Sequence, residues 1–102
     1  MQRGEVWWLE EPNSKRRPAV VLTRQVILDR LSGVTVAAVT THQRDLPTEV
    51  ALTIEQGMPR SCVVSLDNLH TIFRGFLVER ITALDEATMS RVCQALRVAV
   101  AC

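Results

Sequence analysis

The sequence predicts a mainly β fold, a small antiparallel barrel closed by one C-terminal helix. Short runs of alternating or continuous apolar residues, separated by polar turns, recur along most of the chain and are typical of strands. Near the C-terminus the apolar spacing changes to that of a helix face. The length of 102 residues supports one domain, residues 1–102. About five short strands at this length favour a barrel over a sandwich.

In the first half of the chain, three segments have the pattern of strands. Their ranges are 5–9, 17–23 and 34–40. The first alternates and is rich in β-forming side chains, whereas the other two carry near-continuous apolar runs, typical of strands buried on both faces. Between the first two, a polar stretch with Pro12 and Asn13 predicts a loop. A helical turn is expected at 24–29, before the third strand.

The second half of the chain is expected to contain two more strands and a helix. The strands are expected at 49–53 and 62–66, followed by extended residues at 69–73. One helix face is indicated by apolar residues at i, i+3, i+4, i+7 and i+11, which are Met89, Val92, Cys93, Leu96 and Val100. Asp85 is suited to cap the start of this helix, and Glu86 places negative charge in its first turn.

The composition excludes several classes of protein. No apolar run approaches the roughly 18 residues that a membrane span needs. The segment Met1–Glu5 lacks the apolar stretch of a signal peptide. Cys62, Cys93 and Cys102 are odd in number and widely spaced, so they predict neither a disulfide framework nor a zinc site. We therefore expect a cytoplasmic protein with reduced thiols, the first two of them in small core positions.

The charge of the chain is balanced, with a formal net charge of +1, but its cations are almost all arginines. Of the 12 lysines and arginines, Lys15 is the single lysine. Guanidinium groups suit bidentate contacts to phosphate or carboxylate better than ammonium groups do. A genome rich in arginine codons explains the same bias, so this feature indicates a phosphate-bearing partner only together with other signals.

Polar side chains gather at three expected strand ends. The clusters are Lys15-Arg16-Arg17, then Thr40-Thr41-His42-Gln43-Arg44, and finally Asp67-Asn68 with His70-Thr71. Pro18 holds Arg17 extended, so this guanidinium is fixed beside a core strand. Each cluster also has a purely structural interpretation. The first can be a solvated loop, the second can reflect the strand propensity of threonine, and the third can be a turn that hydrogen-bonds its own backbone. No metal-ligand spacing or phosphate loop is present, so we expect no metal and no cofactor.

Five blocks of sequence, in order, resemble the MazF/PemK family of toxin–antitoxin endoribonucleases. The blocks are Arg3–Trp7, Arg17–Thr23, Val36–Thr41, Leu46–Val50, and Ser61–Val64 followed by Asp67–Ile72. The resemblance extends from residue 3 to about residue 97 and includes the closing helix. Departures from the family pattern are a shorter loop after the first strand, Ala38 in place of Pro, Asn68 in place of Gln, and His70 in place of Arg.

The resemblance implies an SH3-like barrel of the MazF/CcdB type that works as a homodimer. It implies a toxin that cleaves single-stranded RNA at short sequence motifs, arrests growth and is inhibited by a cognate antitoxin. RNA is then expected in a groove shared by two subunits. The family's catalytic arginine corresponds to Arg17, its catalytic threonine or serine to Thr40, and its later Asp-Gln pair to Asp67-Asn68.

Metal-independent RNA cleavage requires a base for the 2′-OH proton, positive charge at the five-coordinate phosphorus, and an acid for the leaving 5′-oxygen. Arg17 meets the second need, because its fork matches two phosphate oxygens. Thr40 can hydrogen-bond a phosphate oxygen and fix the in-line geometry. His42 has a suitable unperturbed pKa for the acid or base, and Asp67 is the alternative. Further candidate RNA-binding residues are Arg16, Thr41, Asn68 and Thr71.

Two other functions stay open from the sequence. A toxin of the CcdB type shares this fold but acts on DNA gyrase through a protein interface. Its activity resides in C-terminal residues, whereas Ala99–Cys102 is apolar and without features here, which favours the ribonuclease. The other alternative is an RNA-binding module that does not cleave its ligand.

Overall fold

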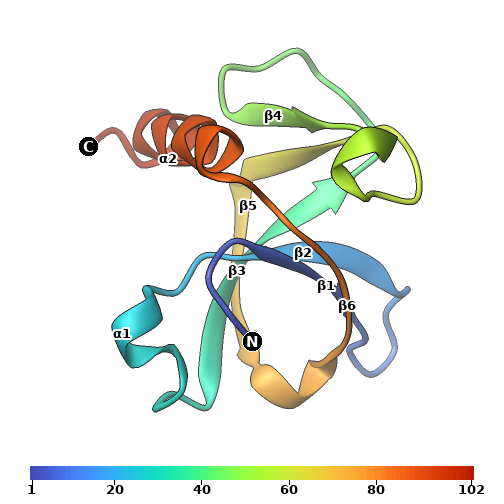
Figure 1. Cartoon of the computed structure of the whole chain (residues 1–102), viewed down its shortest axis with the longest axis vertical. Coiled ribbons are helices and arrows are strands. Elements are labelled where there is room, and N and C mark those ends of the chain that lie inside the picture. Colours follow the sequence, from blue (N-terminus) through green and yellow to red (C-terminus); the bar gives the residue numbers. More distant parts are fainter.

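The computed structural model describes residues 1–102, and its six strands form one antiparallel sheet in the order β4-β5-β3-β2-β1-β6 (Figure 1). The strands are β1 (Glu5–Leu9), β2 (Arg17–Val21), β3 (Gly33–Thr40), β4 (Glu49–Leu52), β5 (Cys62–Phe73) and β6 (Leu77–Ala83). Helix α1 (Gln25–Leu28) connects β2 to β3, and helix α2 (Glu86–Val100) follows β6. Two 3₁₀ turns flank β5, at Ile54–Gln56 and Arg74–Phe76.

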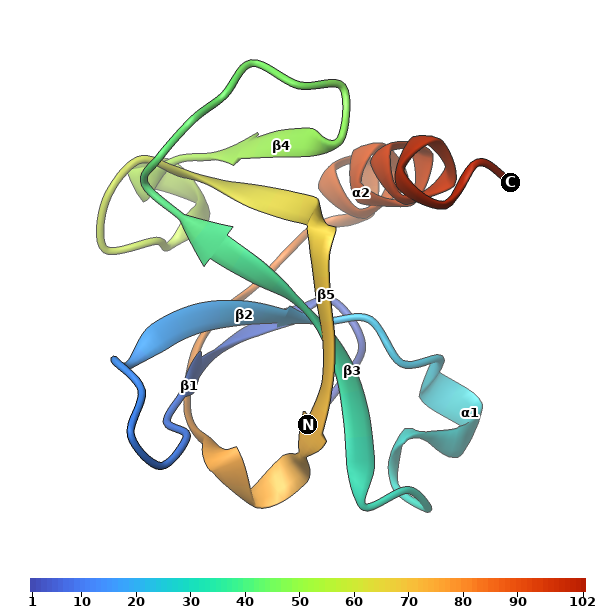
Figure 2. The same cartoon turned by 180° about the vertical axis from the view of Figure 1, so that it is seen from behind.

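The longest strand, β5, bends in the middle and so serves both halves of the sheet (Figure 2). Its first part pairs with β3 and β4, whereas its second part pairs with β3 alone. The register with β3 shifts between these parts, because Ser65 pairs with Ala38 but Leu69 pairs with Ala37. Residues 66–68 therefore bulge out of the ladder. Such a bulge curves a sheet and helps it to close into a barrel.

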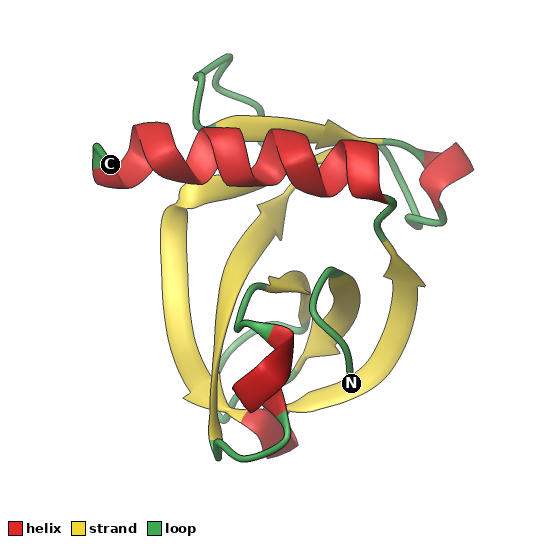
Figure 3. Ribbon diagram, turned by 60° about the vertical axis from the view of Figure 1, so that its left-hand side comes forward, coloured by secondary structure: helices red, strands yellow, loops and turns green.

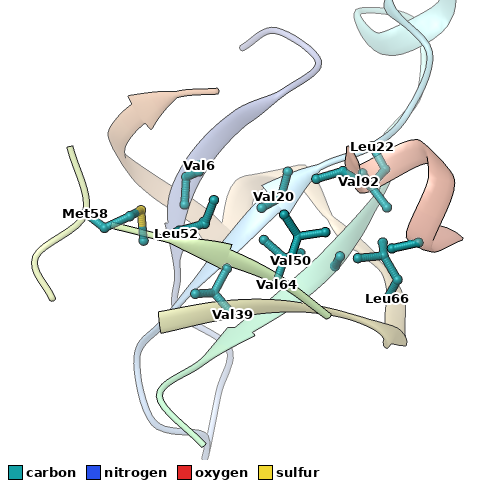
Figure 4. Close-up of a cluster of buried hydrophobic side chains, with 12 residues drawn as sticks. Val6, Val20, Leu22, Val39, Val50, Leu52, Met58, Val64, Leu66 and Val92 are labelled. Atoms are coloured by element: carbon teal, nitrogen blue, oxygen red, sulfur yellow. The ribbon is translucent and has the colours of Figure 1, made fainter. Parts of the chain in front are cut away.

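The curved sheet packs apolar side chains on both of its faces. The larger core has 12 buried residues, which include Val20 of β2 and Val92 of α2 (Figure 4). The smaller core has 8, which include Ala19 and Val21 of β2 together with Leu28 of α1. Because side chains alternate along a strand, β2 contributes to both cores. This burial explains the continuous apolar run that predicted the strand.

Helix α2 lies across one end of the curved sheet, where it contacts β4 and β5 (Figure 3). It begins where predicted, since the backbone N–H of Thr88 donates a 2.8 Å hydrogen bond to the Asp85 carboxylate. Its fully buried positions are Thr88, Val92 and Ala95, so the inner face is turned slightly from the predicted one and Val100 is exposed. Neither helix of the chain is long and apolar enough to cross a membrane.

Most predicted elements form within a few residues of their expected ranges, and the differences concern β6, the length of β5 and two cysteines. The sequence pattern did not predict β6, because this edge strand exposes Val78, Glu79 and Arg80 in succession and so does not alternate. The extended residues expected at 69–73 continue the strand expected at 62–66, because the bulge interrupts the pairing but not the extended backbone. Cys62 is half-buried at the margin of the larger core, and Cys93 is half-buried on α2, so neither is inside the core.

Candidate active site

Arg17 and Thr40 lie side by side at one end of the sheet. β2 begins at Arg17 and β3 ends at Thr40, and the ladder between them pairs Ala19 with Ala38. Continuing this antiparallel register by two residues places Arg17 opposite Thr40. The fold therefore joins two polar clusters that are well separated in the chain.

Both residues line one hollow of about 520 Å³. Part of its lining is apolar and continues the larger core, from which Val39 and Met58 reach the hollow. Trp8 and Pro18 extend this apolar lining. The polar lining consists of Lys15, Arg16, Arg17, Thr40, Thr41, Arg60 and Asn68. A ligand in the hollow would therefore meet both an aromatic surface and a set of cations.

Positive charge dominates the hollow, because four lining residues are cationic and none is acidic. Neighbouring carboxylates pair with two of these cations. Glu11 Oε1 lies 3.8 Å from Nη2 of Arg17, while Arg16 reaches Glu10 at 3.5 Å and Glu79 at 3.1 Å. These ion pairs are solvent-exposed, and such pairs hold their partners weakly. The hollow therefore suits a polyanion whose phosphates replace the carboxylates.

The backbone that follows β3 orients the hydroxyl of Thr40. The backbone N–H of His42 donates to Thr40 Oγ1 over 3.1 Å. The oxygen thus accepts one hydrogen bond, and the hydroxyl proton remains available for an acceptor in the hollow. A phosphate oxygen is such an acceptor.

The bulge of β5 separates its two polar residues. Asn68 lines the hollow, whereas Asp67 does not. Instead, Asp67 Oδ2 accepts a hydrogen bond from the hydroxyl of buried Thr48. The backbone oxygen of Thr48 also accepts a 2.9 Å hydrogen bond from the N–H of Leu66. Thr48 therefore clamps the two residues that precede Asn68 and fixes the direction of the bulge.

The structure brings most of the predicted site residues together. Those that line the hollow are Arg16, Arg17, Thr40, Thr41 and Asn68. His42 is exposed just outside it, and Asp67 is turned toward Thr48. Thr71 lies on the second part of β5, where its hydroxyl meets that of Thr35 at 3.1 Å. Asp67 and Thr71 therefore do not line the hollow with Asn68, because Asp67 bonds Thr48 and β5 continues toward the start of β3.

The lining residues that were not predicted as site residues include Trp8, Arg60 and Cys62. Arg60 lies in the turn before β5, so a basic residue just before a strand, the same signal that identified Arg17, could have found it. Burial raises the pKa of the Cys62 thiol, which therefore stays protonated at neutral pH. Trp8 has the largest apolar side chain of the three.

The groups available in the hollow are guanidinium, ammonium, hydroxyl, amide and thiol. No three His, Cys, Asp or Glu side chains of the chain come together in a way that could hold a metal ion. Guanidinium and hydroxyl groups bind phosphate oxygens through charge-assisted and neutral hydrogen bonds. The arrangement can therefore grip a phosphodiester.

Comparison with known proteins identifies relatives that match nearly the whole chain. Residues 2–100 match the family described as PemK-like, MazF-like toxins of type II toxin–antitoxin systems. The probable endoribonuclease MazF2 of Mycobacterium tuberculosis is 42% identical over 103 residues, covering 100% of both chains. The solved Mycobacterium tuberculosis toxin MazF-mt6 superposes with a TM-score of 0.88 at 33% identity, covering 95% of this chain and 96% of its own. A mycobacterial endoribonuclease in complex with its cognate antitoxin shares the fold, with a TM-score of 0.90 at 23% identity and coverage of 99% and 95%.

These matches confirm the resemblance that the sequence blocks indicated, and they confirm the predicted fold, a mainly β structure with one main C-terminal helix. They do not favour the CcdB-type alternative, because the family model that matches describes MazF-like toxins over almost every residue. The chain therefore belongs to the family of PemK-like, MazF-like toxins of type II toxin–antitoxin systems.

Proposed function

We propose that this toxin is an endoribonuclease that cleaves single-stranded RNA at short sequence motifs and thereby arrests growth. The observation that carries the proposal is the meeting of Arg17 and Thr40 in one cationic hollow. The relatedness to a probable endoribonuclease over the full chain supports the same activity. The scissile phosphodiester binds between these two side chains, and the 2′-OH of the adjacent ribose attacks the phosphorus.

Arg17 stabilises the negative charge that develops during this attack. Its guanidinium fork matches two non-bridging oxygens of the five-coordinate phosphorane, so its positive charge lies where the negative charge develops. In the free protein Glu11 lies 3.8 Å away, so a bound phosphate replaces this carboxylate. Because Arg17 itself supplies the positive charge at phosphorus, the proposed cleavage needs no metal ion.

Thr40 positions the phosphate for in-line attack. Its oxygen already accepts the N–H of His42, so its proton is directed to a phosphate oxygen. A single neutral hydrogen bond of this kind mainly orients the phosphate and does little to stabilise its developing negative charge. Replacing Thr40 should therefore have a smaller effect than replacing Arg17.

We extend the proposal to His42 as the acid or base. Imidazole is the side chain whose unperturbed pKa allows proton transfer in both directions near pH 7. His42 follows Thr40 by two residues and its side chain is exposed, so the ring is free to turn toward RNA in the hollow. If His42 transfers the proton, the pH profile of kcat/KM for wild type should contain an inflection that His42→Asn lacks.

We also propose a homodimer in the cytoplasm, with an RNA groove shared by the two subunits and a cognate antitoxin that occupies it. The structural neighbour solved with its cognate antitoxin supports such a partner. Small domains gain buried surface by pairing with a second copy. Sedimentation at micromolar concentration should give twice the mass of the 11.4-kDa chain, and a monomer would contradict the shared groove.

The activity is tested by incubating the purified protein with single-stranded RNA in the presence of EDTA. Sequencing the 5′ ends of the fragments maps the cleavage sites. The products should carry 2′,3′-cyclic phosphate and 5′-OH ends, because the 2′-oxygen is the nucleophile.

Arg17→Ala should reduce cleavage about 10²–10³-fold, the usual cost of losing one group that stabilises a developing charge. Arg30→Ala is the matched control, since Arg30 is exposed and does not line the hollow. Intact RNA, or fragments with 5′-phosphate ends, would contradict the proposed activity.

A further inference from the structure

Trp8 presents an aromatic surface to the cationic hollow, and the mechanism above gives it no role. Its neighbour Trp7 packs against the smaller core, and Nε1 of Trp7 donates a 3.0 Å hydrogen bond to Glu5. Trp8, by contrast, lines the hollow and pairs across the sheet with Pro18, the residue after Arg17. The Trp8 indole therefore belongs to the same lining as the proposed phosphate-binding residues.

Arg16 covers the Trp8 ring in the free protein. The guanidinium carbon of Arg16 lies 4.6 Å from the ring centroid. Glu10 and Glu79 hold the same guanidinium at 3.5 Å and 3.1 Å. All three charged side chains are between 43% and 60% exposed, so water and salt weaken these pairs. The Arg16 guanidinium is thus held over the ring by weak ion pairs, and a stronger anion can replace the two carboxylates.

We propose that the indole of Trp8 is a stacking platform for a nucleobase next to the scissile phosphate, and that Arg16 moves from the ring to a phosphate when RNA binds. This inference rests on the proposed RNA cleavage at Arg17 and Thr40. The charge of RNA drives the exchange, because a guanidinium fork matches phosphate oxygens and the carboxylates it leaves remain solvated. The uncovered ring then receives the base.

Stacking on Trp8 would fix the strand without reading its sequence, because every base has a π face. Sequence reading would fall instead to Asn68, whose amide lines the same hollow and can pair with a base edge. Trp8 would thus set the affinity for any single strand, whereas Asn68 would set the cleaved motif.

The test uses an RNA whose cleavage site has been mapped with the wild-type protein. Two further RNAs carry an abasic nucleotide, one on each side of the scissile phosphate. Trp8→Leu keeps apolar bulk but removes the π face, whereas Trp8→Phe keeps an aromatic ring. Trp7→Phe is the matched control, because Trp7 is the adjacent residue and packs against the core rather than lining the hollow.

On intact RNA, Trp8→Leu should lower kcat/KM roughly 5–150-fold, the fold-change that corresponds to losing one base–aromatic stack. Trp8→Phe should retain most of the activity. On one of the two abasic RNAs the loss caused by Trp8→Leu should disappear, because no base remains to stack. An equal loss on all three RNAs, or no loss on any, would overturn the inference.

A fluorescence measurement separates failure of this inference from failure of the proposed activity. The chain has no tyrosine and two tryptophans, so Trp7→Phe leaves Trp8 as its single strong fluorophore. Titration with the intact RNA carrying a 2′-deoxy group at the cleavage site should quench Trp8, and the matching abasic RNA should quench it much less. RNA that binds with unchanged Trp8 emission would overturn the platform even if cleavage is confirmed. Wild-type protein that cleaves no RNA would instead refute the proposed activity.

Discussion

The hydrogen bond from Thr48 to Asp67 gives a direct test of how the bulge of β5 is held. Thr48→Val replaces the buried hydroxyl with a methyl group of similar shape, while Asp67→Ala removes its exposed acceptor. The double variant Thr48→Val/Asp67→Ala removes both groups. If Thr48 holds Asp67 through this bond, the stability losses of the two single variants should not add up in the double variant.

The expected losses follow from the burial of the two partners. After Thr48→Val, water can solvate the exposed carboxylate, so we expect folding stability to fall by about 1–1.5 kcal/mol, at or just below the usual range for a hydrogen bond to a charged group. Asp67→Ala leaves a hydroxyl without its acceptor on a residue that is only 6% exposed, which typically costs about 1–3 kcal/mol. The double variant should lose no more than Asp67→Ala alone, because its valine has no polar group to leave unsatisfied. The resulting coupling energy between the two sites should be about 1 kcal/mol.

Urea unfolding of the wild type and the three variants measures these losses as shifts in midpoint at constant slope. For a domain of this size, each kcal/mol also lowers Tm by roughly 4–8 °C. Thr41→Val is the matched control, since the Thr41 hydroxyl is exposed, and it should change stability by less than about 0.5 kcal/mol. Additive losses in the double variant would show that Thr48 and Asp67 do not interact and would refute the clamp.

Other predictions concern the stability of the chain. Val92→Ala empties a fully buried position in the larger core and should cost roughly 2–3 kcal/mol in urea unfolding, whereas a loss near zero would mean that α2 does not pack there. Burial raises the pKa of Glu5, but hydrogen bonds from Trp7, the backbone N–H of Gln2 and Arg80 outweigh it and lower the pKa below its ordinary value of 4.5. The folded state thus binds fewer protons, so wild type should lose stability as pH falls below about 4.5 more steeply than Glu5→Gln, and parallel melting curves would contradict this role. Hydrogen bonds from Thr88 likewise lower the pKa of Asp85, so Asp85→Ala should lower Tm at pH 7 by an amount that shrinks in acid, where the wild-type cap is protonated; an equal gap at both pH values would count against it.

Local patterns in the sequence predict most of the strands and the C-terminal helix. β2 is readable because its run of small apolar residues is buried on both faces, and α2 because an acidic cap precedes a helical apolar repeat. The apolar runs also placed Arg17 and Thr40 at strand ends, but it was the family resemblance that assigned them to one site. The structure supplies the reason that they meet, which is the antiparallel pairing of β2 with β3.

Other features depend on contacts that no local pattern encodes. The strand β6 lies at the sheet edge, so its apolar alternation is weak and its exposed residues resemble a loop. The separation of Asp67 from Asn68 depends on a shift in register that is held by Thr48, a residue from another part of the chain. In the sequence, Trp8 is one of two adjacent tryptophans on a predicted strand. Only the fold places it beside Arg16 and Arg17.

The central claim is that Arg17 stabilises a phosphodiester under attack rather than merely attracting RNA. Single-turnover cleavage by wild type and Arg17→Ala at saturating RNA measures the first effect, and the Kd for an RNA with a 2′-deoxy group at the cleavage site measures the second. We predict that the rate falls about 10²–10³-fold while the Kd changes by a much smaller factor. An unchanged single-turnover rate with weakened binding would contradict the account.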